Sequence, residues 1–233
     1  MDASETDNIP YVFTIGECEY TLKKSELPPY LESLVAFKSS SRNDNDSGDD
    51  KSQRFALDDP IAELEAALAG IQDGYRSIFP LLKTDAVRYQ TLCATYDFLL
   101  VDVASELPIA NLVEELKYTR QYGGDEGRGS LAQSRDAAFK LIYIVLTTET
   151  QEVKDLNRIY DAVLYVVSHP RTFTLDMRTV VLEAYLDRFP TSRKQRDNLE
   201  TWSNKFATDF ADSEDEDYFA MSYDPYAYDS DFD

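Results

Sequence analysis

Residues 11–37 read YVFTIGECEYTLKKSELPPYLESLVAF, and this stretch predicts a pair of strands followed by a helix. Residues 11–15 are apolar, with aromatic and β-branched side chains, while residues 18–23 alternate between apolar and polar, which is the period of a half-buried strand. Gly16 and Glu17 separate the two runs. Glycine in the first position is typical of a type II′ turn, because that position needs a positive φ. We therefore expect a β-hairpin.

The first helix is expected to open at Pro28 and Pro29, because proline is well tolerated in the first turn of a helix. Its apolar residues are Tyr30, Leu31, Leu34, Val35 and Phe37. The sequence that follows, SSSRNDNDSGDDK, contains no apolar side chain. It predicts a solvated, acidic and flexible loop over residues 39–53.

A short strand and two helices are predicted after this loop. Residues 55–57 are the strand, and Asp59 followed by Pro60 has the pattern of a helix N-cap and first helical position. The first of these helices should end near Gly74, and its apolar face contains Ile61, Leu64, Leu68 and Ile71. The second has a longer apolar stripe, made of Tyr89, Leu92, Cys93, Tyr96, Leu99 and Leu100.

The segments YVFTIGECEYTLKKSEL, PPYLESLVAF, RFALDDPIAELEAAL and LCATYDFLLVDV follow one another between Tyr11 and Val103. In this order they resemble the BTB/POZ fold, a family of protein-interaction domains that begins with a β-hairpin and continues with packed helices. The resemblance implies an α+β fold that is mostly helical, with a small N-terminal sheet. One departure is the short acidic stretch before FALDD, which leaves little room for the family's middle strand and helix. An unrelated α+β domain that begins with a hairpin is the alternative.

The resemblance also implies a function. BTB/POZ-like domains are non-enzymatic adaptors or scaffolds that self-associate or recruit a protein partner, for example for a cullin-type ubiquitin ligase or a transcription-linked complex. In the family geometry, self-association would use the hairpin and the first helix. The residues concerned here are Tyr11, Phe13, Tyr20, Leu22, Tyr30 and Leu31.

The chain divides into four expected parts. Residues 1–10 form a polar N-terminus that we expect to be disordered, and residues 11–104 form the BTB/POZ-like domain. Residues 105–208 form an all-helical region, with a glycine-rich break over residues 121–130. Residues 209–233 form an acidic and aromatic tail. Helical extensions after the domain are usual in the BTB/POZ family.

Periodicity predicts the helices of the second region. The first contains Ile109, Leu112, Val113 and Leu116, and the next covers residues 131–148 and is apolar nearly all round, as expected of a central helix. A one-sided helix contains Val153, Leu156, Tyr160, Val163, Leu164 and Val167 and ends at His169 and Pro170. Another covers residues 175–189. The last begins with a capping box, Ser192 and Gln195, and turns Leu199, Trp202, Phe206 and Phe210 inward.

Charge is concentrated at the end of the chain. The net charge is −21, and residues 209–233 contain ten acidic and no basic residues. Phosphate binding needs a clustered positive surface, so we expect no nucleic-acid partner. The only basic cluster is Arg193, Lys194 and Arg196, which is able to fold back against the acidic tail.

The tail combines its acids with aromatic residues. Ordering it would cost about 1–2 kcal/mol per residue in backbone entropy, and its like charges repel, so we expect it to be disordered alone. It is either a solubilising tail or a partner-binding segment whose aromatic side chains enter an apolar groove. The partner-binding candidates are Tyr218, Phe219, Tyr223, Tyr226, Tyr228 and Phe232.

Residue types that support catalysis are scarce. His169 is the only histidine, and its place at a helix end favours a structural role beside the C-terminal carbonyls. The glycines of residues 121–130 lack the lysine of a phosphate-binding loop. We therefore expect no catalytic residues, no cofactor and no metal. Two other hypotheses remain open: an acidic partner-masking protein that binds basic proteins or mimics nucleic acid, and an enzyme with unusual carboxylate chemistry.

Sequence also gives expectations about location. Cys18 and Cys93 lie on apolar faces, which favours buried free thiols over a disulfide and fits a reducing compartment. Apolar runs fall short of the roughly 20 residues that span a bilayer, and the N-terminus lacks the features of a signal peptide. We expect an intracellular protein, in the cytoplasm or nucleus, with protein partners that include a second copy and no membrane contact.

Overall fold

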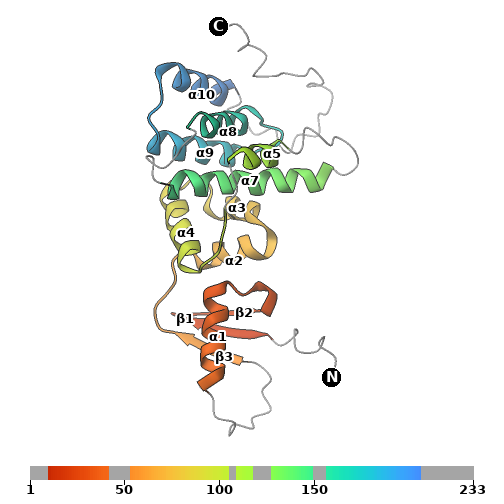
Figure 1. The fold of residues 1–233 in the computed structure, drawn as a ribbon, viewed down its shortest axis with the longest axis vertical. Helices are drawn as coiled ribbons and strands as arrows, with labels where there is room; N and C mark the ends of the chain where they lie inside the picture. The colour runs from red at the N-terminus through yellow and green to blue at the C-terminus, as the bar shows by residue number, and fades with distance from the viewer. Residues whose placement is uncertain (1–9, 42–52, 105–108, 118–126, 149–155, 206–233) are drawn as a thin grey trace. The chain divides into compact units, whose positions relative to one another are not determined.

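A computed structural model describes residues 10–41, 53–104, 109–117, 127–148 and 156–205. The chain forms two compact units, residues 1–106 and 107–233, which are described separately. Unit 1 combines a small sheet with helices, and the described elements of unit 2 are all helices (Figure 1). The predicted fold class, α+β and mostly helical with a small N-terminal sheet, is confirmed.

The sheet of unit 1 has three strands in the order β2-β1-β3. β1 (Tyr11–Ile15) and β2 (Cys18–Leu22) form the predicted antiparallel hairpin. Gly16 has a φ of 60° at the turn, and its N–H donates to the Leu57 carbonyl at 3.0 Å. β3 (Gln53–Leu57) runs parallel to β1, so the hairpin turn is fixed to the end of a strand that is distant in sequence.

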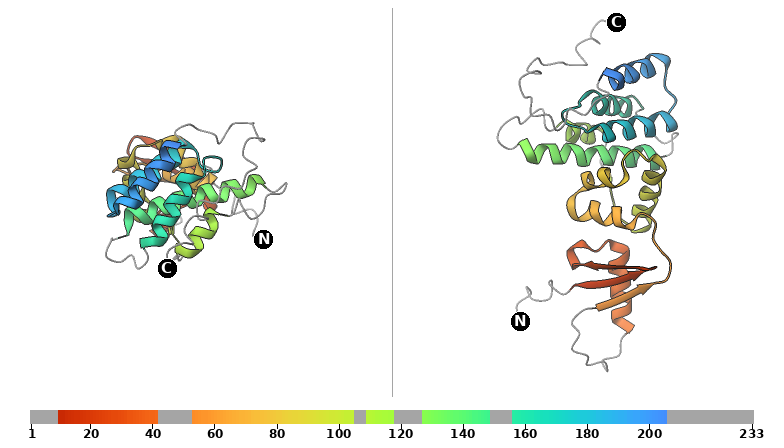
Figure 2. Two further views of the ribbon diagram at one scale, coloured as in Figure 1. Left: turned by 90° about the horizontal axis from the view of Figure 1, so that it is seen from above. Right: turned by 180° about the vertical axis from the view of Figure 1, so that it is seen from behind.

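One face of the sheet belongs to the core. Phe13 is fully buried and stacks on Phe55, with ring centroids 5.2 Å apart. Helix α1 (Pro29–Ser41) crosses one face of the sheet (Figures 1 and 2). The prediction that Cys18 is buried is wrong, because its side chain is exposed. Cys18 follows the turn directly and sits at the end of an edge strand, where no neighbouring strand covers it.

Helix α1 follows a short 3-10 turn, η2 (Lys24–Glu26). Leu31 and Val35 of α1 are buried, as its apolar pattern predicts. Phe37 belongs to the same pattern, but it is 72% exposed. An apolar stripe on a helix marks either a face that packs on the core or a face that binds a partner. The sequence pattern is the same in both cases, and only the fold shows which one applies.

The helix predicted to begin at Asp59 and Pro60 begins later. α2 covers Leu64–Asp73, and Glu63 before it has a left-handed φ of 51°. Two contacts keep the preceding residues out of a helix. Pro60 packs on the hairpin turn, where a Cβ on Gly16 would lie 3.3 Å from the Pro60 Cβ. The Ala62 carbonyl, in turn, accepts a hydrogen bond from the Thr95 hydroxyl at 2.6 Å.

Two short elements that periodicity did not predict follow α2. They are η3 (Tyr75–Ser77) and α3 (Ile78–Leu82), and α3 contributes Ile78, Phe79 and Leu82 to the core. Helix α4 (Ala86–Phe98) is capped by Asp85, whose carboxylate accepts from the backbone N–H groups of Val87 and Arg88 at 3.1 and 3.2 Å.

The predicted apolar stripe of α4 is confirmed except at its end. The buried members are Tyr89, Leu92, Cys93, Tyr96 and Leu99. Leu100 is 61% exposed and has a left-handed φ of 58°, because α4 has already ended at Phe98.

Unit 2 contains five described helices, α5 (Ile109–Leu116), α7 (Gly127–Thr147), α8 (Leu156–Ser168), α9 (Leu175–Arg188) and α10 (Arg193–Lys205). α7 packs on α5, α8 and α9, which agrees with its predicted central place. It begins at Gly127, inside the predicted glycine-rich break. Figure 2 shows α8, α9 and α10 stacked on one side of α7.

Helix α8 departs from its predicted one-sided character. Every residue from 162 to 168 is buried, because α8 packs against α5, α7, α9 and α10. At the other end of the unit, the predicted capping box of α10 is confirmed: Ser192 N–H donates to Gln195 at 3.0 Å, and Gln195 N–H donates to Ser192 Oγ at 3.2 Å. Leu199 is buried as predicted, and Trp202 is half-buried. Phe206 and Phe210 lie outside the described residues.

Candidate interaction surface

Exposed apolar side chains are the most informative surface feature of unit 1. Scattered exposed apolar residues are normal, whereas a contiguous group marks a site for a partner. Among the described residues of unit 1, the large apolar side chains that are exposed are Phe37, Leu81, Val87, Phe98 and Leu100. A partner site requires that several of them lie side by side.

The end of α4, with Phe98 and Leu99, meets the beginning of α1, and Leu100 follows directly. The ring of Phe98 lies 4.7 Å from the ring of Tyr30, centroid to centroid. The Tyr30 N–H donates to the Leu99 carbonyl at 3.2 Å, which fixes the start of α1 to the end of α4. Along α1, Tyr30, Leu34 and Phe37 follow at a spacing of four and then three residues, which places them on one face of the helix.

We call these five residues, Tyr30, Leu34, Phe37, Phe98 and Leu100, the α1–α4 patch. Tyr30 and Leu34 are half-buried, and the other three are exposed. Phe37 and Phe98 are 72% and 49% exposed. The patch therefore leaves two phenyl rings in water although unit 1 has its own core, and aromatic side chains of this kind are typical anchors of protein interfaces.

Leu100 has a backbone conformation that leucine seldom adopts. Its N–H donates to the Asp97 carbonyl at 3.1 Å, and the next N–H, of Val101, donates to the Tyr96 carbonyl at 3.0 Å. This pair of hydrogen bonds ends many helices, and the residue at the position of Leu100 is usually glycine, because a side chain is strained there. An exposed leucine at this position costs stability without adding to the core. A cost of this kind is typical of a functional residue.

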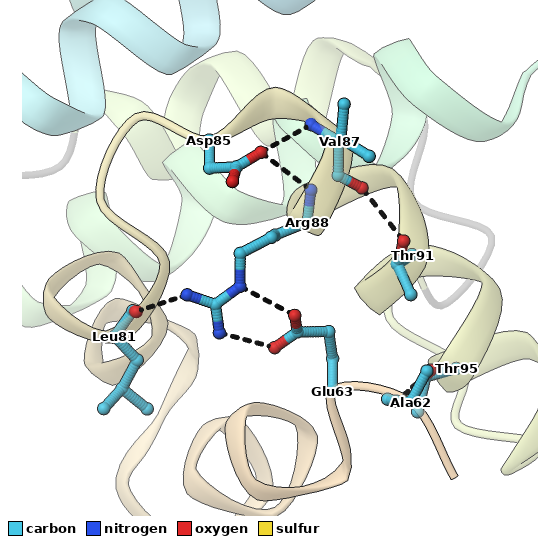
Figure 3. Close-up of polar contacts among 8 residues, drawn as sticks. All are labelled: Ala62, Glu63, Leu81, Asp85, Val87, Arg88, Thr91 and Thr95. Atoms are coloured by element: carbon cyan, nitrogen blue, oxygen red, sulfur yellow. Dashed lines mark hydrogen bonds and ion pairs between the residues drawn. The ribbon is translucent and has the colours of Figure 1, made fainter.

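A polar cluster positions α4 (Figure 3). Arg88 donates to both carboxylate oxygens of Glu63, from Nε at 2.7 Å and from Nη2 at 2.8 Å, and from Nη1 to the Leu81 carbonyl at 3.1 Å. The hydrogen bonds that Arg88 donates to Glu63 raise the pKa of Arg88 above its ordinary value. Together with the hydrogen bond from Thr95 to Ala62, these contacts hold α4 against the start of α2.

Leu81 and Val87 belong to this cluster rather than to the α1–α4 patch. Leu81 lies in α3 before the buried Leu82, and its carbonyl accepts from Arg88 (Figure 3). Val87 occupies the first turn of α4, at the opposite end of that helix from Phe98. Val87 is 72% exposed, the same fraction as Phe37. The two residues therefore form a matched pair for mutation.

The residues predicted for self-association differ in burial and lie in different parts of unit 1. Phe13, Leu22 and Leu31 are buried in unit 1, so they stabilise the fold and have no surface to offer a partner. Tyr11 and Tyr20 are half-buried in the sheet, and burial raises the pKa of Tyr20. Only Tyr30 lies in the α1–α4 patch. Periodicity placed Phe37 and Leu100 on the apolar stripes of α1 and α4, and it did not single out Phe98 as an interaction residue.

The aromatic residues of the tail, predicted to bind a partner, lie outside the described residues. They are Tyr218, Phe219, Tyr223, Tyr226, Tyr228 and Phe232. The basic cluster Arg193, Lys194 and Arg196 is described, and all three side chains are exposed in the first turn of α10.

His169 forms part of the turn that ends α8. Its Nδ1 lies 2.7 Å from the Tyr165 carbonyl, and its ring stacks on the Tyr165 ring at 3.8 Å. Since a carbonyl oxygen only accepts, Nδ1 carries the proton in this contact. Ser168 Oγ lies 3.0 Å from Nδ1 and donates to the same carbonyl at 3.2 Å, so its proton is directed at the backbone. This geometry gives both residues a structural role in the turn.

The two thiols differ in environment. Cys18 is exposed, and Cys93 is buried in α4, where desolvation raises the pKa of its thiol to about 12. Among the residues that the structure describes, no group of three or more histidine, cysteine or acidic side chains is arranged to hold a metal ion. Within the same part of the chain, no helix is both long and apolar enough to cross a membrane.

Comparison of the chain with protein-family models, with curated proteins and with solved structures finds no match in any of the three.

Proposed function

We propose that this protein is a BTB/POZ-like interaction module that self-associates through the α1–α4 patch and serves as a non-enzymatic adaptor or scaffold. Two features support the assignment of class. The first is the order of elements in unit 1: a hairpin, a helix, a strand parallel to the first strand, and then packed helices. The second is the sequence resemblance of residues 11–103, whose hairpin, first helix and FALDD strand occur at the expected positions.

Leu100 is the single observation that carries the choice of surface. A left-handed leucine that is 61% exposed lowers the stability of the chain on its own, and it extends a group of exposed aromatic residues. Burying Phe37, Phe98 and Leu100 against a second copy would remove all three from water at once. Burial of one large apolar side chain contributes roughly 1.5–3 kcal/mol. Two copies contribute twice the set, and this gain works against the cost of association, so we expect a dissociation constant in the micromolar range or weaker.

The test compares two substitutions of equal exposure in the full chain. Phe37→Glu places a charge inside the proposed interface, and Val87→Glu places the same charge on an equally exposed apolar residue outside the patch. Light scattering coupled to size-exclusion chromatography should give a dimer for the unaltered chain and for Val87→Glu, and a monomer for Phe37→Glu. Thermal unfolding should change little in both variants, since both side chains are on the surface. Equal masses for the two variants would contradict the choice of surface.

A further inference from the structure

The exposed surface of α10 is net positive, with four Lys and Arg residues against Asp197 and Glu200, in a chain whose net charge is −21. The described residues of unit 2 contain twelve Lys and Arg residues and nine Asp and Glu residues, so this part of the chain is net positive. Arg193, Lys194 and Arg196 are exposed within the first turn of α10, and Lys205 is exposed at its end. Between them, Trp202 is half-buried, with Lys205 Nζ 4.7 Å from the centre of its ring. We call these five residues the α10 basic surface.

α10 packs on the bundle through one face, and Trp202 lies on that face by its spacing, so only its exposed part borders the basic side chains. Leu199 is fully buried, and Asn198 donates to the Tyr160 hydroxyl at 3.0 Å, so α10 packs on α8 through the face that contains these two residues. The ion pair from Arg193 Nε to Asp197 is long, at 3.8 Å, and its side chains are 96% and 66% exposed. A pair this exposed contributes little to stability and exchanges readily for other carboxylates.

Residues 209–233 have the complementary chemistry and begin a few residues beyond α10. They contain ten acidic residues and no basic residue, including the unbroken acidic run of residues 214–217. A helix of thirteen residues, the length of α10, is about 20 Å long. The twelve residues 206–217 reach up to about 40 Å when extended, so the acidic run is able to return to Arg193 along the whole helix.

We propose that residues 209–233 dock on the α10 basic surface of the same chain, with the acidic run on Arg193, Lys194 and Arg196 and an aromatic side chain beside Trp202. The tail thereby occupies this surface, and an acidic partner protein would have to displace the tail in order to bind there. The proposal is independent of self-association, because the surface belongs to unit 2 and the α1–α4 patch to unit 1.

Tethering makes this weak contact effective. Exposed ion pairs are individually weak, so a separate peptide with three or four pairs would bind weakly. A short flexible tether raises the effective concentration of the tail to about the millimolar range and thereby favours the docked state. The contact should be sensitive to salt, since the screening length falls from about 8 Å at physiological ionic strength to about 3 Å at 1 M.

The single tryptophan provides the measurement. Trp202 is the only tryptophan of the chain and lies on the proposed surface, so it serves as the energy-transfer donor in the full chain. An acceptor is attached to the tail through Ser222→Cys in a Cys18→Ser background, because the remaining thiol, Cys93, is buried with a raised pKa. Energy transfer is then followed from low salt to about 1 M NaCl.

The expected result is transfer that falls at least twofold at high salt. A triple variant, Arg193→Gln with Lys194→Gln and Arg196→Gln, should show the low transfer at every salt concentration. The matched control removes three exposed charges from unit 1, with Lys24→Gln, Arg54→Gln and Lys83→Gln, and should behave as the parent chain. Transfer that neither salt nor the α10 variant changes would overturn the proposal. So would transfer that disappears on mixing with excess unlabelled chain, because the tail would then occupy a second copy.

Discussion

Glu63 and Arg88 face each other across the start of α2 and the first turn of α4, with both carboxylate oxygens within 2.8 Å of guanidinium nitrogens. Glu63 has a left-handed backbone, a conformation that is strained for a residue with a side chain. The ion pair offsets this strain, because its two parallel hydrogen bonds are of the strong, charge-assisted kind. The pair thus connects an irregular loop to the helix that ends at the α1–α4 patch.

Arg88→Lys should destabilise the protein, because lysine is unable to make the forked contact with Glu63 and also loses the bond to the Leu81 carbonyl. Urea denaturation followed by circular dichroism measures the change. Arg54→Lys, on the exposed face of β3, is the control and should stay within about 0.5 kcal/mol of the parent. In a double-mutant cycle with Glu63→Gln and Arg88→Met, simple additivity would show that the pair contributes nothing of its own.

Gly70→Ala should destabilise unit 1 by roughly 1–3 kcal/mol, because a Cβ at this buried position would collide with the Tyr96 hydroxyl and lie 2.9 Å from the Ile78 side chain. The Tyr96 hydroxyl donates to the Ala67 carbonyl at 3.1 Å and has no room to move freely. Tyr96→Phe removes the colliding oxygen. The double variant, Gly70→Ala with Tyr96→Phe, should therefore lose less stability than the sum of the two single changes. Fully additive losses would show that the Tyr96 hydroxyl is not the group with which the new methyl collides.

Only one thiol of the native protein should react quickly with Ellman's reagent. Cys18 is exposed on the edge strand, whereas Cys93 is 2% exposed and its raised pKa, about 12, keeps it protonated near neutral pH. Unfolding in guanidinium should release a second equivalent. Cys18→Ser should abolish the fast reaction of the native chain, and a fast reaction that persists in this variant would show that Cys93 is accessible.

Alkaline conditions should destabilise the fold. Burial raises the pKa of Cys93 from 9.0 to about 12 and that of Tyr185 from 10.0 to about 12, and burial also raises the pKa of Tyr96. Below about pH 9 the folded and unfolded chains both hold these protons, so the contribution to stability is complete. Above that pH the unfolded chain loses protons that the folded chain keeps, and the free energy of unfolding falls by about 1.4 kcal/mol per pH unit for each group until the folded pKa is reached.

Urea titrations between about pH 8 and pH 11 test this slope. The Cys93→Ala variant is less stable throughout because of the cavity, but its stability should fall less steeply with pH, since one of the titrating groups is gone. If the stability of Cys93→Ala falls as steeply with pH as that of the parent chain, groups other than Cys93 cause the alkaline loss.

Local signals predicted the local parts of this fold. The alternation of residues 18–23 and the glycine of the turn specify the hairpin, and Ser192 with Gln195 specifies the start of α10. The pairing of β3 with β1 is non-local, and no pattern within either strand indicates it. Asp59 and Pro60 have a strong helix-start signal, which is overruled by the packing of Pro60 on the hairpin turn.

The candidate surface was harder to predict for a physical reason. Periodicity groups apolar residues on one face of a helix, but it does not distinguish a face that packs on the core from a face that is exposed. Phe37 and Leu100 both continue stripes that begin with buried residues. Leu100 leaves the stripe because α4 ends two residues earlier, at a boundary that the sequence marks with leucine instead of glycine.

Leu100→Gly should separate stability from assembly. Glycine relieves a left-handed strain of about 1–2 kcal/mol, and part of this gain is lost to the greater freedom of the unfolded chain, so the melting temperature should stay level or rise. The same change removes an exposed apolar side chain from the α1–α4 patch, and the dimer dissociation constant should increase at least tenfold, about 1.4 kcal/mol. A variant that is less stable but equally dimeric would assign Leu100 to the fold alone.

The most direct test of self-association is sedimentation equilibrium of the unaltered full chain over a concentration series. Self-association through the α1–α4 patch predicts a mass that rises with concentration from 26.6 kDa to twice that value. A mass that stays at 26.6 kDa up to high micromolar concentration would contradict it.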